Sequence, residues 1–173
     1  MRNLPVLPQN RWGQGFWLVF QFRQHRLDPK QYPHKLLHAS CVSVEGRGIL
    51  ILGPAGSGKS SLALKLMGLG ADLVSDDRTF VRRTSDRLIA TCPDTIKGQI
   101  EARGVGLLTF AALDYAELAL VVDLSLQIDE RLPNDDTFGI FGITLRCIGR
   151  SRLDAFAEAV YFLAKGVGSN DQV

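Results

Sequence analysis

Residues 53–60 read Gly53-Pro54-Ala55-Gly56-Ser57-Gly58-Lys59-Ser60. This stretch fits the pattern G-x-x-x-x-G-K-[ST] of a phosphate-binding loop, or P-loop. An apolar run at residues 49–52 precedes it and indicates a buried strand, and apolar residues at helical spacing follow it from 62 to 69. A chance glycine-rich turn would not need a strand before it and a helix after it. The stretch therefore predicts an α/β fold in which these eight residues bind a nucleoside triphosphate or a related phosphate ligand.

The residue types of the loop suit the chemistry of phosphate binding. Glycines allow tight turns and bring backbone N–H groups close to phosphate oxygens, with no Cβ in the way. The helix that follows directs the positive end of its dipole at the same phosphates. Lys59, which we expect to be exposed, can reach the β- and γ-phosphates, and the Ser60 hydroxyl can bind Mg²⁺. The sequence thus predicts ATP and Mg²⁺ as cofactors.

The composition indicates one domain of an ordinary soluble protein. Of the 173 residues, 46% are hydrophobic and 22% are charged, which suits a chain with a sizeable core. The net charge of +2 is too small to favour nucleic acid as a partner. The three cysteines lie far apart without metal-binding spacing, so we expect reduced thiols. No apolar run approaches the roughly 20 residues of a membrane span, so we expect no membrane association and a cytoplasmic location.

The pattern of apolar and polar residues divides the chain into three parts. We expect an N-terminal extension at residues 1–34, a P-loop kinase domain at 35–168 and a tail at 169–173. Within the domain, strands besides the one before the P-loop are predicted at 36–44, 71–74, 79–83, 87–91, 118–124 and 140–148. Polar loops are predicted at 93–106 and 129–137. An amphipathic helix from 153 to 164 is expected to pack on the core.

A P-loop enzyme usually needs a carboxylate at the end of a neighbouring strand, where it holds Mg²⁺ or its water. Two places in the sequence provide one. Asp123 ends an apolar strand, as in an ordinary Walker B motif, and Asp76-Asp77 end the short strand after the P-loop helix. Adjacent side chains on an extended backbone point to opposite faces, so one of the pair could face Mg²⁺ while the other accepts a proton. The spacing alone leaves both places open.

Three stretches taken together resemble the catalytic domain of the HPr kinase/phosphorylase family. They are residues 40–60, the pattern G-x-x-L-V-x-D-D at 70–77, and Ile100–Leu108, which is similar to the family signature Leu/Ile-Glu-x-Arg-Gly-x-Gly. The resemblance runs from about residue 36 to about residue 132 and lacks the usual N-terminal domain, as in the short forms of alphaproteobacteria. It implies a core similar to phosphoenolpyruvate carboxykinase, with a mixed sheet flanked by helices.

The resemblance implies a role for each residue around the loop. Lys59 and Ser60 match the phosphate-binding lysine and the Mg²⁺-binding hydroxyl of the family. Asp76 and Asp77 match its aspartate pair, of which we take Asp77 as the proton acceptor. His38 matches a histidine that interacts with this catalytic carboxylate. A protonated imidazole would favour the ionised carboxylate, and desolvation would oppose that effect.

Three further residues are matched by the same resemblance. Glu101 matches a second Mg²⁺ ligand, and Arg103 lies in the motif that serves both directions of the family's reaction. Arg131 resembles an arginine of a D-R-L-G segment, although Pro133 replaces the glycine. Without the family motifs, His38 would be interpreted as a core histidine and the other three as surface charges. Asp123 then has a structural role, such as capping the next turn.

The implied function is an ATP-dependent kinase of a serine on a small phosphocarrier protein of the HPr type. Family members also remove this phosphate by phosphorolysis and form hexamers. The family's P-G-R-N segment, which is tied to phosphorolysis, has only a partial match at residues 148–152 that lacks the Pro and the Asn. The sequence therefore supports the kinase direction better than the reverse.

Two other functions are compatible with a P-loop. One is a kinase of a small metabolite, and the other is a regulator that binds a nucleotide without catalysis. The aspartate pair argues against the regulator, because binding alone does not need a proton acceptor.

Overall fold

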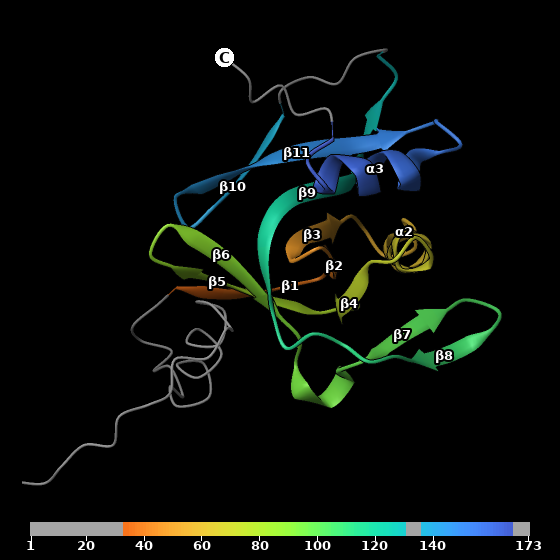
Figure 1. Cartoon of the computed structure of the whole chain (residues 1–173), viewed down its shortest axis with the longest axis horizontal. Helices are drawn as coiled ribbons and strands as arrows, with labels where there is room; N and C mark the ends of the chain where they lie inside the picture. The colour runs from red at the N-terminus through yellow and green to blue at the C-terminus, as the bar shows by residue number, and fades with distance from the viewer. Residues whose placement is uncertain (1–32, 131–135, 168–173) are drawn as a thin grey trace, which may run out of the picture. The chain divides into compact units, whose positions relative to one another are not determined.

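The computed structural model describes residues 33–130 and 136–167. These residues form a mixed nine-stranded sheet, two α-helices, a 3-10 helix and a separate two-stranded hairpin (Figure 1). The strands are β1 (His34–Leu37), β2 (Ser40–Val44), β3 (Arg47–Leu52), β4 (Asp72–Ser75), β5 (Thr79–Thr84), β6 (Arg87–Thr91), β7 (Gln99–Ala102), β8 (Gly106–Thr109), β9 (Ala116–Ile128), β10 (Thr137–Ile140) and β11 (Ile143–Ser151). The helices are α2 (Lys59–Gly68), η1 (Asp94–Ile96) and α3 (Phe156–Ala164). The predicted α/β class with a mixed sheet is confirmed.

Strands β3 and β11 both pair in parallel with β9, so their carboxyl ends lie on the same side of the sheet. The main sheet has the order β1-β5-β6-β9-β3-β2-β4, and β11 also pairs with β9. Both β3 and β11 run parallel to β9, and Asp123 of β9 is the register partner of Leu52 on one side and of Gly149 on the other. The other strand pairs of this sheet are antiparallel. The carboxyl ends of β3 and β11 therefore meet where the P-loop begins.

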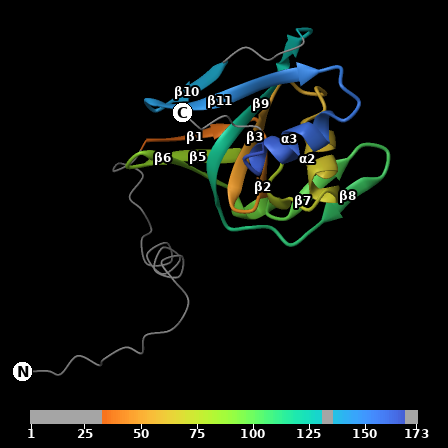
Figure 2. The ribbon, with the colours of Figure 1, turned by 45° about the horizontal axis from the view of Figure 1, so that its top comes forward.

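Alternation along β3 builds a core on each face of the sheet. Ile49 and Ile51 are buried on the face that α2 and α3 cover, with Leu66 and Val160 from these helices. Leu50 points to the other face and packs with Val81 of β5 and further side chains of β6, β9 and β11. Figure 2 shows the two helices side by side over the central strands. The P-loop helix is thus fixed by a continuous apolar contact with the sheet.

Several predicted boundaries are wrong. The strand predicted at 36–44 is two strands, because β1 pairs with β5 whereas β2 pairs with β3 and β4, and His38 lies in the bend between them. The predicted loop at 93–106 holds η1 and β7. The last strand predicted at 140–148 is a hairpin of β10 and β11 that turns at residues 141–142. The predicted hairpin at 79–91 is confirmed.

The described part of the chain holds no helix with the length and hydropathy needed to span a bilayer. The predicted extension and tail fall almost wholly outside the described residues, so their boundaries stay predictions.

Candidate active site

The P-loop joins the end of β3 to the first turn of α2. Gly53, Gly56 and Gly58 have φ angles of 143°, 78° and 96°, a region that residues with a Cβ rarely adopt. A Cβ on Gly53 would also lie 2.5 Å from the Ser57 Oγ. The loop closes through a hydrogen bond of 3.1 Å from the Ser57 N–H to the Pro54 carbonyl. The glycines are therefore required for the shape of the loop, as its chemistry predicts.

Lys59 is buried, contrary to the prediction of an exposed side chain, with a relative exposure of 6%. Its Nζ donates to the carbonyls of Gly53 at 3.1 Å and Pro54 at 3.2 Å, and it lies 3.3 Å from the His38 Nε2. The reason is its place at the first position of α2, directly inside the turn of the loop. The ammonium group is thus held at the centre of the site and not in solvent.

The two neighbouring aspartates point in different directions. Asp76 is buried and accepts hydrogen bonds from the Ser40 hydroxyl at 2.5 Å and from the Ser60 hydroxyl at 2.9 Å. Asp77 is exposed and has a φ of 60°, in the left-handed region that Asp tolerates better than most residues. Its Oδ1 lies 3.2 Å from the His38 Nε2. One carboxylate therefore faces the Ser60 hydroxyl, and the other faces the histidine.

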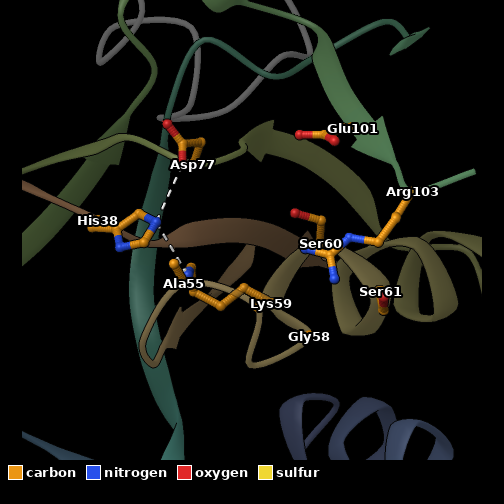
Figure 3. Close-up of a pocket in the computed structure, with 10 residues that line it drawn as sticks. His38, Ala55, Gly58, Lys59, Ser60, Ser61, Asp77, Glu101 and Arg103 are labelled. Atoms are coloured by element: carbon orange, nitrogen blue, oxygen red, sulfur yellow. Dashed lines mark hydrogen bonds and ion pairs between the residues drawn. The ribbon is translucent and has the colours of Figure 1, made fainter. Parts of the chain in front are cut away.

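His38 stands between Lys59 and Asp77, and its Nε2 is the atom that both contact (Figure 3). An imidazole nitrogen that carries a proton donates a hydrogen bond, and one without a proton accepts a hydrogen bond. With a proton on Nε2, His38 donates to Asp77. Without that proton, Nε2 accepts from the Lys59 ammonium. The position of one proton therefore decides which neighbour His38 binds.

Glu101 and Arg103 reach the site from the separate β7–β8 hairpin. The Glu101 N–H contacts the Asp76 Oδ2 at 3.4 Å, which brings the hairpin beside the aspartate pair. Both side chains are exposed and face the P-loop helix across an open cavity of about 270 Å³ (Figure 3). The cavity is lined by His38, Ala55, Gly56, Gly58, Lys59, Ser60, Ser61, Asp77, Glu101 and Arg103. The structure thus gathers segments far apart in sequence around one space.

The donors at this cavity fit a Mg²⁺ ion that substrate phosphates complete. The Asp76 carboxylate accepts from the Ser60 hydroxyl and from the backbone N–H of Glu101, so it lies between these two residues that line the cavity. Among the described residues, no three His, Cys, Asp or Glu side chains form a ready metal cage. Mg²⁺ is commonly held by one or two carboxylates plus phosphates and waters, so a complete cage is not required.

Some predicted and alternative residues lie elsewhere. Asp123 accepts hydrogen bonds from the N–H and hydroxyl of Ser125, at 2.9 and 2.6 Å. Both residues lie inside β9, so Asp123 neither ends its strand nor caps a turn, and its contact is local to the strand. Arg131 lies outside the described residues. Burial raises the pKa of Cys92 to about 11 and that of Cys41 further, so these thiols are protonated at neutral pH and unsuited to nucleophilic chemistry.

Sequence reasoning missed one residue of the site and misjudged the place of another. Ser40 is buried and fixes Asp76, but a serine in an apolar strand gives no signal of this contact. Arg150 falls in the partial match at residues 148–152, where nothing predicts a contact with the P-loop, yet its guanidinium donates to the Ser57 carbonyl of that loop. The parallel order of β3, β9 and β11 is what brings Arg150 to the loop, and that order depends on long-range pairing.

Much of the chain is similar to known proteins. The family model described as HPr Serine kinase C-terminal domain matches residues 30–135, which is more than half of the chain. The HPr kinase/phosphorylase of Caldanaerobacter subterraneus subsp. tengcongensis is 37% identical over 108 residues, which cover 60% of this chain and 35% of the relative. That of Geobacillus thermodenitrificans is 36% identical over 113 residues, which cover 61% and 37%. The chain thus spans about a third of the length of these curated relatives.

A solved structure is similar over a larger share of its own chain. The Hpr(Ser) kinase/phosphatase from Coxiella burnetii superposes with a TM-score of 0.67 at 26% identity, and the match covers 76% of this chain and 95% of that one. The residues that the family model matches include the P-loop, the aspartate pair and the β7–β8 hairpin. The chain belongs to the family of the HPr Serine kinase C-terminal domain.

Proposed function

We propose that the chain is an ATP- and Mg²⁺-dependent kinase that phosphorylates a serine on a small phosphocarrier protein of the HPr type. The observation that carries the proposal is that the P-loop and the His38–Asp77 pair line the same cavity. A phosphate site next to a carboxylate that can accept a proton is the arrangement that phosphoryl transfer to an alcohol needs. The names of the relatives support the same reaction class.

Each residue has a defined part in this mechanism. Asp77 accepts the proton of the attacking serine hydroxyl. His38 holds Asp77 in place through its Nε2, and a protonated His38 would favour the ionised form of Asp77. Lys59 and the N–H groups of the loop stabilise the transferring phosphoryl group by positioning and electrostatics. Ser60 and Glu101, with Asp76 beside them, would hold Mg²⁺, which neutralises the charge that develops on the phosphates. Arg103, at the tip of the hairpin, supplies a further positive charge to the cavity.

A second cavity supports a protein acceptor over a small metabolite. It has a volume of about 610 Å³ and shares Asp77 and Glu101 with the nucleotide cavity. Apolar side chains line it, among them Leu36 and Leu107, which are 44% and 63% exposed. A small polar metabolite is usually held in a pocket by converging polar groups. An open groove that combines exposed apolar side chains with charged ones suits the side chains that flank a serine on the surface of a protein.

Transfer of label from γ-labelled ATP tests the proposal. Purified chain, Mg²⁺ and a purified HPr-type carrier should give a labelled carrier, and a carrier with its target serine replaced by alanine should stay unlabelled. The Asp77→Asn enzyme serves as the catalytic control. Label on a small molecule would support a metabolite kinase instead. ATP binding with no transfer to any acceptor would support a regulator.

Further parts of the proposal follow from the family. By analogy we propose a homo-oligomer, specifically a hexamer, that works in the cytoplasm, where ATP is available. The proposal includes a reverse activity in which inorganic phosphate removes the phosphoryl group from the carrier. Light scattering of the purified chain would measure its mass against 19.0 kDa for one subunit.

A further inference from the structure

We propose that Arg150 is a positioning residue that fixes one peptide group of the P-loop and thereby directs its N–H at the bound phosphates. The inference rests on nucleotide binding at the loop, which is part of the proposed function. Arg150 lies 93 residues after Ser57 in sequence, yet its guanidinium donates a hydrogen bond to the Ser57 carbonyl. It also lies so close to Gly58 that a Cβ there would come within 3.3 Å of its Nη2.

The strand pairing explains how Arg150 reaches the loop. It lies near the end of β11, which runs parallel to β9, and β9 runs parallel to β3. Between Gly149 and Arg150 the register on β9 shifts from Asp123 to Gln127, so β9 bulges at this point. A Cβ on Gly149 would lie 2.7 Å from the Leu126 carbonyl, so only glycine allows this close approach. The sheet therefore places Arg150 at the edge where the P-loop begins.

The planarity of the peptide bond turns this contact into a constraint on phosphate binding. In a trans peptide the carbonyl and the N–H that follows it point in opposite directions. When Arg150 holds the Ser57 carbonyl on the outer side of the loop, the Gly58 N–H points away from Arg150. This N–H belongs to the row of loop amides that the P-loop chemistry directs at phosphate oxygens.

The neighbouring peptide groups already have partners. The Ser57 N–H donates to the Pro54 carbonyl at 3.1 Å, and the Gly58 carbonyl accepts from the Leu62 N–H at 2.9 Å. The peptide group between these two bonds is the one that Arg150 holds. Glycine at position 58, with a φ of 96°, makes rotation of this peptide easy because glycine adopts positive and negative φ with similar ease. Arg150 therefore opposes a rotation that would turn the N–H away from the phosphates.

The first test compares Arg150→Ala with Arg152→Ala in the absence of nucleotide. Arg152 is a matched control because it lies two residues further on, is 83% exposed and pairs with Asp129 at 3.3 Å. Amide hydrogen exchange at Ser57 and Leu62 should rise in Arg150→Ala and stay unchanged in Arg152→Ala. Arg150→Lys, which keeps a charged donor, should recover part of the protection. Equal exchange in the two alanine variants would overturn the inference.

The second test measures affinity for ATP and for ADP by calorimetry. Loss of one amide contact to a charged phosphate should weaken both nucleotides about tenfold in Arg150→Ala, with a smaller effect on turnover at saturating ATP. Weaker binding of ATP alone, together with a large loss of turnover, would mean that Arg150 contacts the γ-phosphate and would overturn the inference. If the unmodified protein bound neither nucleotide, the proposed function would fail, and the exchange test would still decide the role of Arg150.

Discussion

At the scale of single residues, the two neighbouring aspartates point in different directions. In the proposed mechanism, Asp76 lies beside the Mg²⁺ ligands and Asp77 accepts the proton. Asp76 is buried against Ser40 and Ser60, whereas Asp77 is exposed and faces His38. We expect Asp77→Asn to lower transfer by at least about 100-fold, since it removes the proton acceptor. Nucleotide affinity should stay within about tenfold, because Lys59 and Ser60 remain. Initial rates with the carrier and calorimetry with ATP measure the two effects.

Asp123→Asn is the comparison variant for this prediction. Its carboxylate accepts hydrogen bonds from Ser125 within β9 and does not line the cavity, so its loss should be milder. Loss of activity in Asp123→Asn with activity retained in both Asp76→Asn and Asp77→Asn would show that the other strand carries the catalytic carboxylate.

Lys59→Ala should remove most of the phosphoryl transfer, by about 100-fold or more, as expected for loss of a fixed donor at a developing charge. Because Lys59 is buried and bonded to two loop carbonyls, a moderate loss of thermal stability should accompany the change. Lys65→Ala, on the exposed side of the same helix, should affect neither property. Near-normal turnover in a folded Lys59→Ala protein would contradict the role of the loop.

At the scale of elements, the contact between β9 and β11 fixes the position of Arg150. A Cβ at Gly149 would clash with the Leu126 carbonyl and Ile128, both of β9. Gly149→Ala should therefore cost about 1–3 kcal/mol of stability and weaken nucleotide binding as Arg150→Ala does. Gly139→Ala on β10 is the control, since a Cβ there meets no atom within 4 Å. Thermal unfolding and calorimetry measure both effects, and unchanged values for Gly149→Ala would show that β11 can move without loss.

The sequence predicts elements well where a local pattern decides them. The P-loop context, the 79–91 hairpin and the C-terminal helix are each visible within a short window, and the structure contains all three. The break at His38 was missed because partners distant in the chain decide it. The β7–β8 hairpin pairs locally, within residues 99–109, but only Ile100 of its strands is buried, so it has no clear apolar alternation. The same limit applies to the site. Motifs indicate Lys59 and the aspartate pair, but burial of Lys59 and the contact of Arg150 depend on packing.

At the scale of the whole molecule, the balance between the forward and reverse reactions depends on how the site holds free phosphate. Arg150 donates to the loop and Arg152 pairs with Asp129, and neither lines the nucleotide cavity. With the Pro and Asn of the family segment also replaced, we expect clear kinase activity and weak phosphorolysis that needs higher phosphate. Release of pyrophosphate from the phosphorylated carrier at millimolar phosphate, compared with the forward rate, measures this. A reverse rate equal to the forward rate would contradict the expectation.

The shared nitrogen of His38 has a consequence for the order of events. Lys59 at 3.3 Å and Asp77 at 3.2 Å compete for the same Nε2. In the proposed mechanism, phosphates in the loop would attract the Lys59 ammonium and leave Nε2 to Asp77, so the base would be prepared only after the nucleotide has arrived. We therefore expect a compulsory sequence, nucleotide first and carrier second. A carrier without its target serine should therefore inhibit uncompetitively with respect to ATP, whereas random arrival would give mixed inhibition.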